Sequence, residues 1–169
     1  MATTDELLQN AERYAEGFDQ GDLPMPPGRK VAVLACMDAR LNPYGILGLR
    51  EGDAHVIRNA GGVVSDDVIR SLAISQNLLG TEEIILIHHT DCGMLTFKDD
   101  EVKGAIEKEV GIRPHFALES FTDLEADVKQ SIARIKASPF IPNKSNIRGF
   151  VYDVKTGRLN EVQAIAGVR

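Results

Sequence analysis

Two short apolar runs place the strongest limit on what this chain can fold into. Residues 31–36 read Val-Ala-Val-Leu-Ala-Cys and residues 83–88 read Glu-Ile-Ile-Leu-Ile-His, without the alternation of apolar and polar side chains that a half-exposed strand shows. Such runs are typical of strands that are buried on both faces, as in a parallel sheet. The runs therefore predict a central sheet that is mostly parallel.

The rest of the main segment alternates between strand and helix patterns. The expected elements are strands over residues 53–57, 147–154 and 160–162 and helices over residues 66–79, 102–110 and 124–137. Strands that alternate with helices predict an α/β fold, in which helices flank the sheet.

The N-terminal segment has a different character. Residues 3–18 carry an apolar stripe at helical spacing that includes Leu7, Tyr14 and Phe18, and residues 19–29 are rich in proline and glycine. We expect two units: residues 1–29, an amphipathic helix with its linker, and residues 30–169, the α/β domain. The stripe must be buried against that domain or against a second subunit.

Length and charge limit the partners of the chain. Its 169 residues suit one domain with a small appendage. The chain has 19 Lys and Arg residues against 25 Asp and Glu residues, a net charge of −6, so it lacks the positive charge with which proteins neutralise nucleic-acid phosphates. No signal-like start and no apolar run of about 20 residues is present. We expect no nucleic-acid or membrane partner and a cytoplasmic location.

Chemically active side chains follow both apolar runs. Cys36 ends the first run and is followed by Asp38 and Arg40, while His89 and Cys92 follow the second run. Because the carboxyl ends of parallel strands meet at one edge of the sheet, we expect these residues to lie close together.

Two thiolates and one imidazole form a ligand set for Zn²⁺. Three protein ligands leave a fourth position open, as in catalytic rather than structural zinc sites. Asp38 would then compete for that position or accept a hydrogen bond from bound water, and Arg40 would hold the carboxylate off the metal. Packing of two buried cysteines explains the spacing equally well. The position of both cysteines at strand ends, beside a histidine, favours zinc.

Three motifs in register make the chain similar to a known family. They are Cys36-x-Asp38-x-Arg40, Arg58-Asn59-Ala60-Gly61 and His89-x-x-Cys92-Gly93. In order and spacing the chain resembles the β-class carbonic anhydrases, in particular their compact bacterial-type branch, which also includes carbonyl sulfide hydrolases. The resemblance implies Zn²⁺ held by Cys36, His89 and Cys92, with Asp38 and Arg40 as a catalytic pair. It also implies Asp38 as a fourth ligand in a closed state.

The resemblance further implies an activity and an assembly. The implied activity is the reversible hydration of CO₂ to bicarbonate by zinc-bound hydroxide, and the alternative is hydrolysis of carbonyl sulfide or CS₂ at the same site. The implied assembly is a homodimer, often paired into a tetramer, in which the N-terminal helix reaches across to its partner. The chain departs from plant-type members because it has no glutamine just before Cys36 and reads Gly93-Met94-Leu95 after the second cysteine. We expect a narrower and more apolar pocket.

Several residues near these motifs have simpler explanations. Gly61 and Gly62 most simply form a tight turn, although their backbone amides, like that of Gly93, are candidates for the substrate site. His88 is expected to be packed or hydrogen-bonded, and Asp91 to support the ligands or the turn between them.

Two other classes of protein stay open. A thiol redox protein would use the two cysteines, but the chain has no Cys-x-x-Cys motif. A zinc-binding module without turnover would not need the open fourth position beside an Asp–Arg pair.

Overall fold

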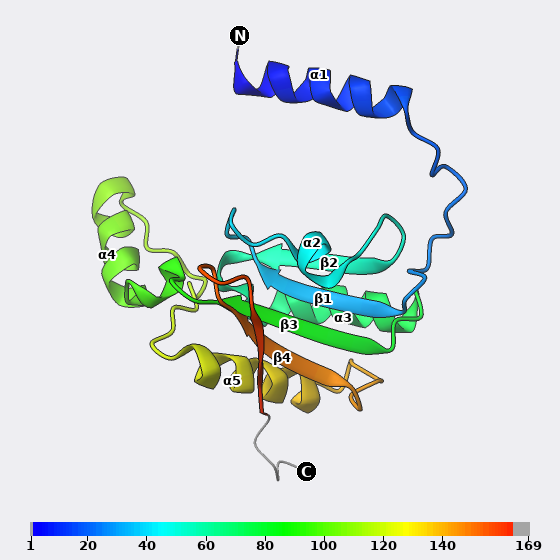
Figure 1. Ribbon diagram of the computed structural model, residues 1–169. Helices are drawn as coiled ribbons and strands as arrows, with labels where there is room; N and C mark the ends of the chain where they lie inside the picture. The colour runs from blue at the N-terminus through cyan, green and yellow to red at the C-terminus, as the bar shows by residue number, and fades with distance from the viewer. Residues whose placement is uncertain (1, 164–169) are drawn as a thin grey trace.

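A mostly parallel sheet forms the centre of the molecule. The computed structural model describes residues 2–163, so the predicted end of the α/β domain at residue 169 lies outside the described residues. The sheet that these residues form has five strands in the order β2-β1-β3-β4-β5 (Figure 1). The strands are β1 (Val31–Cys36), β2 (Ala54–Asn59), β3 (Glu83–His89), β4 (Ile147–Tyr152) and β5 (Leu159–Val162). The first four pair in parallel and β5 runs antiparallel to β4, which confirms the predicted fold class.

Helices connect and cover these strands. Those described are α1 (Thr3–Glu16), α2 (Pro43–Leu47), α3 (Asp66–Asn77), α4 (Asp99–Val110) and α5 (Leu124–Ala137), with 3₁₀ turns η1 (Ala60–Gly62) and η2 (Gly93–Leu95). Among the described helices, none combines the length and the apolar character that crossing a membrane would need. Neither α2 nor η2 was predicted from the sequence, whereas η1 contains the tight turn expected at Gly61 and Gly62.

Both faces of β1 are buried, which explains its unbroken apolar sequence. Ala32 and Leu34 contribute to a core that includes apolar residues of α3 and α5. Val33 and Ala35 contribute to a second core on the other side, which contains the loops after β1 and β3. All six residues of the strand are buried, as expected for a central strand of a parallel sheet.

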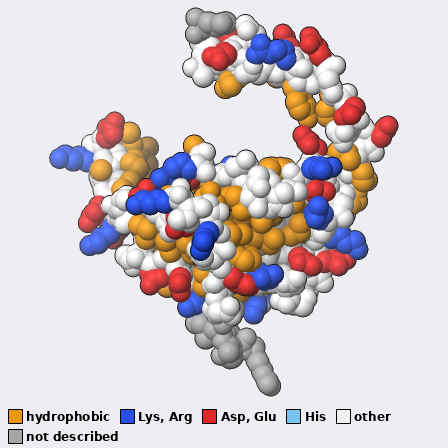
Figure 2. Space-filling model, viewed as in Figure 1, with side chains coloured by type: hydrophobic (Ala, Val, Ile, Leu, Met, Phe, Trp, Pro, Cys, Tyr) orange, Lys and Arg blue, Asp and Glu red, His pale blue; other side chains and the backbone are white. Residues whose placement is uncertain are grey.

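The second face of the sheet is only partly covered within one chain. It carries half-buried side chains such as Val56, Ile85 and Leu159, and its helical cover includes Ile46 and Leu47 of the short α2. Figure 2 shows hydrophobic side chains gathered in the centre of the body, on the face turned toward the viewer, where Figure 1 draws the strands. A single chain therefore leaves apolar surface exposed beside the sheet.

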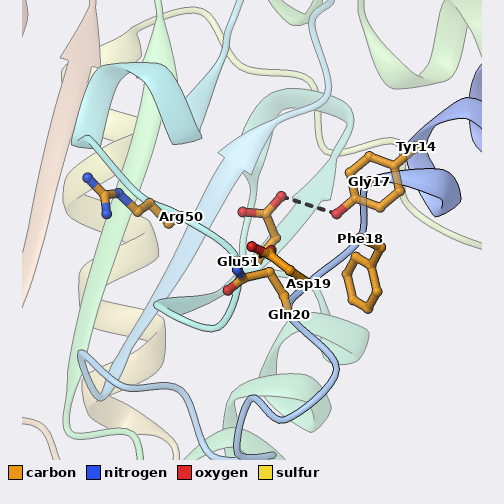
Figure 3. A pocket seen from close by; sticks show the side chains of 7 residues that line it. All are labelled: Tyr14, Gly17, Phe18, Asp19, Gln20, Arg50 and Glu51. Atoms are coloured by element: carbon orange, nitrogen blue, oxygen red, sulfur yellow. Dashed lines mark hydrogen bonds between the residues drawn. The ribbon is translucent and has the colours of Figure 1, made fainter.

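The helix α1 stands away from the body (Figure 1). None of its residues is buried, and Leu7 and Tyr14 of its apolar stripe keep 59% and 58% of their surface exposed. Near its C-terminal end, Tyr14 Oη lies 3.3 Å from Glu51 Oε1 and donates a hydrogen bond to it. Figure 3 shows this contact beside a hollow of about 460 Å³ between the end of the arm and the turn before β2. The stripe of α1 is thus not buried against its own domain.

Candidate metal centre

Two neighbouring strands bring three potential metal ligands together. Cys36 is the last residue of β1 and His89 is the last residue of β3, and these strands pair in parallel. Cys92 follows three residues after His89. All three side chains are buried, and their ligand atoms lie within 4.8 Å of one another. The sheet edge thus places the predicted ligands in one cluster that can hold a metal ion.

The His89 ring is oriented for metal binding. Its Nδ1 lies 2.8 Å from the carbonyl oxygen of Thr90. Because a carbonyl only accepts, Nδ1 must carry the proton, which leaves Nε2 with a free lone pair. That Nε2 is buried and has no hydrogen-bond partner among the described residues. An unpaired buried nitrogen next to two thiols fits a metal ion better than it fits a packed core.

The two thiols influence each other strongly. A hydrogen bond from the Cys92 thiol is the largest cause that lowers the pKa of Cys36, and His89 lowers it further against the opposing effect of burial. The pKa of Cys92 is raised by its neighbour Cys36 and by burial. Both cysteines can be thiolates in this buried site only when a cation lies between them, so the donor set suits a divalent, thiolate-binding metal such as zinc.

The Asp38 carboxylate lies beside this cluster. Its Oδ2 is 3.6 Å from His89 Nε2. Arg40 donates to the same carboxylate from Nε at 3.0 Å and from Nη2 at 2.8 Å, and its backbone amide donates at 2.9 Å. These bonds from Arg40, the side-chain bonds foremost, hold the pKa of Asp38 far below its usual range. A charged carboxylate is therefore fixed next to the ligand atoms.

Asp91 connects the two loops that carry the site. Its carboxylate accepts from Arg40 Nη1 at 2.8 Å, and its carbonyl accepts from Arg40 Nη2 at 3.0 Å. Asp91 has a φ of 55°, a left-handed conformation that aspartate tolerates better than most residues. The residue between the two ligands of the second loop thus forms the turn and also contacts the Asp38–Arg40 pair.

The glycines of η1 allow close approach to the strand ends. Gly62 has a φ of 67°, and a Cβ added there would lie 2.8 Å from the backbone nitrogen of Cys36. Gly61 has a φ of 81°, and a Cβ there would meet the side chains of Met94 and Phe121 at 3.0 and 3.2 Å. The predicted tight turn is present, and at Gly62 any residue with a Cβ would force the neighbouring backbone to move.

A cavity of about 420 Å³ opens at the cluster. It is lined by Cys36, Met37, Asp38, Ala60, Gly61, His89, Cys92, Gly93, Met94 and Phe97. The apolar side chains among them surround the ligand atoms, so the space suits a small molecule with little polarity. Sequence reasoning did not single out Met37 or Phe97, and a hydrophobic residue in a loop gives no signal of its own that it borders a site.

The neighbouring histidines have structural partners. His88 is buried, its Nε2 lies 2.6 Å from Asp127 Oδ2, and its ring packs against Phe121. This confirms the expectation of a packed, hydrogen-bonded histidine. His55 lies 2.7 Å from the Ser75 hydroxyl, away from the residues that line the cavity.

The fold and the cluster define a class: an α/β protein with a metal centre of two cysteines and one histidine at the edge of a parallel sheet. The family model for carbonic anhydrase matches residues 31–159, which span β1 to the start of β5. This chain belongs to the carbonic anhydrase family. The predicted resemblance is thereby confirmed, and so is the predicted zinc cofactor, given the family and the cluster of three ligands.

Individual relatives agree with this assignment. The chain is 62% identical to "Beta-carbonic anhydrase 1" of Mycobacterium tuberculosis over 162 residues, which cover 96% of this chain and 99% of the relative. It is 38% identical to a carbon disulfide hydrolase of Saccharolobus solfataricus over 181 residues, covering 93% and 87%. The crystal structure of carbonic anhydrase from Streptococcus mutans superimposes with a TM-score of 0.90 at 43% identity, covering 96% and 99%.

Proposed function

We propose that this protein catalyses the reversible hydration of CO₂ to bicarbonate, with zinc held by Cys36, His89 and Cys92. The observation that carries the proposal is the buried cluster of three ligands with the charged Asp38 carboxylate 3.6 Å from the unpaired His89 nitrogen. The close similarity to a β-carbonic anhydrase over 96% of the chain supports it.

The residues around the cluster have separate roles in the proposed reaction. The chemistry that zinc supplies when bound is Lewis acidity, which lowers the pKa of a coordinated water to about 7. Asp38 would accept a hydrogen bond from the nucleophile and so orient the nucleophile's lone pair toward the substrate carbon. Arg40 keeps that carboxylate ionised and holds it to one side of the ligand atoms. Met94 and Phe97 give the substrate an apolar space.

Hydrolysis of CS₂ or carbonyl sulfide is the second candidate. These molecules are small, linear and apolar like CO₂, and the same apolar cavity accommodates them. Relatives named carbon disulfide hydrolases, one of them 38% identical to this chain, favour keeping this candidate. The greater similarity to a β-carbonic anhydrase, at 62%, places CO₂ first.

We also propose that the chain acts as a homodimer, or as a tetramer built from dimers, with residues 1–29 as the dimerisation arm and residues 30–169 as the zinc-binding domain. Two exposed apolar surfaces support this: the stripe of α1, and the partly covered second face of the sheet (Figure 2). A second copy would cover both. We propose a cytoplasmic location, because a reducing compartment keeps both cysteines available as thiolates.

Metal content tests the ligand assignment directly. Cys36→Ser replaces a thiolate with a hydroxyl, which is a poor zinc ligand. We expect the purified variant to lose both bound zinc, measured by elemental analysis, and CO₂ hydration, measured by stopped flow. A circular dichroism spectrum like that of the parent would show that the fold persists. Unchanged zinc content would refute the assignment.

A further inference from the structure

The arginine of the Arg58-Asn59-Ala60-Gly61 motif makes an unusual set of contacts. Arg58 lies on β2, next to β1, and its guanidinium donates to three backbone carbonyls of residues 36–41, the last residue of β1 and the loop after it. Its Nε and Nη2 lie 3.0 and 2.7 Å from the carbonyl oxygen of Cys36. The same Nη2 lies 2.8 Å from the carbonyl oxygens of Asp38 and Leu41. One side chain is therefore hydrogen-bonded to the backbone at both ends and in the middle of the segment.

This segment, residues 36–41, carries half of the candidate site. It includes the ligand Cys36 and both members of the Asp38–Arg40 pair. Two backbone bonds also hold this segment: the Met37 amide donates to the carbonyl of Asn59 at the end of β2 at 2.8 Å, and the Leu41 amide donates to the Asp38 carbonyl within the segment at 3.0 Å. The guanidinium of Arg58 thus makes most of the hydrogen bonds described here between residues 36–41 and the neighbouring strand β2.

We propose that Arg58 is a positioning residue, which sets the place of the Asp38 carboxylate relative to the metal ligands by holding the backbone of residues 36–41. Arg58 is not among the residues that line the cavity, and the hydrogen bonds of its guanidinium described above go to backbone carbonyls, so it acts through the backbone. The inference rests on the proposed function only for its effect on turnover; the effect on the backbone is independent of it.

The shape of the guanidinium matters for this task. Its planar, rigid fork presents several N–H groups in fixed directions, whereas a lysine ammonium is a compact charge on a flexible stem. Lysine at this position keeps the charge but cannot reproduce the arrangement that spans three carbonyls. A displacement of about 1 Å in a catalytic group lowers rates by as much as about 100-fold.

Three variants test the proposal. Arg58→Met removes the donors and keeps an apolar stem, and Arg58→Lys keeps the charge. Arg148→Met is the matched control, because Arg148 also makes two short bonds, both at 2.7 Å to Glu161, but lies on β4 outside the cavity lining. Each zinc-loaded variant is measured for zinc content, for kcat and KM, and for hydrogen–deuterium exchange of residues 37–41.

We expect Arg58→Met to retain zinc and to lose about 10- to 100-fold in kcat, with KM little changed. Its amides at residues 37–41 should exchange faster than those of the parent, while exchange elsewhere stays the same. Arg58→Lys should recover part of kcat, and Arg148→Met should match the parent. Parent-like exchange at residues 37–41 in both Arg58 variants would overturn the proposal, and so would full recovery of kcat with lysine. If the parent hydrates no CO₂ while the Arg58 variants still exchange faster than the parent at residues 37–41, the proposed function is contradicted and the positioning role remains.

Discussion

Asp38 is the residue whose surroundings matter most for chemistry at this site. Three donors of Arg40 bind its carboxylate and hold the pKa of Asp38 well below its usual range, so it is charged at neutral pH. Arg40 is itself held by Asp91 from the other loop. The Asp38 carboxylate is therefore fixed from both sides of the site, and neither Asp38 nor Arg40 belongs to the cluster of three candidate ligands.

Asp38→Ala and Arg40→Ala test this division of roles. We expect both variants to keep bound zinc, because the three ligands remain, and to lose about 100-fold in kcat for CO₂ hydration, because a preorganised hydrogen bond to the reacting group is lost. Asp67→Ala and Arg70→Ala are the controls, since they remove a similar pair from the exposed surface of α3. Full activity in either site variant, measured by stopped flow at equal zinc content, would show that the assigned roles are wrong.

The clustering of the three candidate ligands could be predicted from the sequence, but the hydrogen bonds around them could not. Cys36 and His89 end two apolar runs, and parallel strands bring such ends together. The local sequence pattern was therefore enough to predict that both residues lie at the same edge of the sheet. The reach of Arg58 to three carbonyls depends on the register of β2 against β1, which no local pattern encodes. The contact between Arg40 and Asp91 joins residues 51 apart in the chain, and it likewise requires the folded structure.

At the scale of elements, the turn η1 joins the sheet to the site. Its two glycines adopt positive φ values and let the turn approach the ends of β1 and β3. The elements with strong periodicity were well predicted: α5 spans the expected residues 124–137, and β3 extends one residue beyond its expected end. The strand expected over residues 147–154 ends at Tyr152, because Asp153 accepts hydrogen bonds from the amides of Lys155 and Thr156 and starts a turn.

Gly62→Ala tests the role of this turn. The added Cβ would meet backbone atoms of β1 and β3 that cannot move aside, in addition to the strain of a positive φ. We expect the free energy of unfolding to fall by about 3 kcal/mol or more. Gly48→Ala is the matched control, because Gly48 has a similar φ of 62° with nothing within 4 Å of an added Cβ, so we expect a loss of about 1 kcal/mol. Equal losses in urea unfolding would contradict the packing argument.

At the scale of the whole molecule, the exposed apolar surfaces support the proposed pairing with a second copy. The arm α1 has a clear apolar stripe but no buried residue, and the sheet face beside the cavity is only partly covered. The sequence predicted the stripe but left open whether the domain or a partner covers it. The structure excludes the chain's own domain as cover for the described arm, because α1 stands away from it (Figure 1).

A double substitution in the arm tests the proposed assembly. Leu7→Ser with Tyr14→Ser removes apolar area from the stripe and should shift the protein toward the monomer in analytical ultracentrifugation. Glu16→Ser, on the opposite side of the same helix, is expected to leave the mass of the assembly unchanged. If the double variant has the same mass as the parent, the arm does not hold the subunits together.

The central claim is that this site hydrates CO₂, and its most direct test compares substrates. On one preparation of known zinc content, at a mildly alkaline pH, kcat/KM is measured for CO₂ hydration and for hydrolysis of carbonyl sulfide and CS₂. The account predicts that the value for CO₂ is the largest by a wide margin. Efficient hydrolysis of carbonyl sulfide or CS₂ with little hydration of CO₂ would contradict it and would direct attention to Met94 and Phe97 in the cavity.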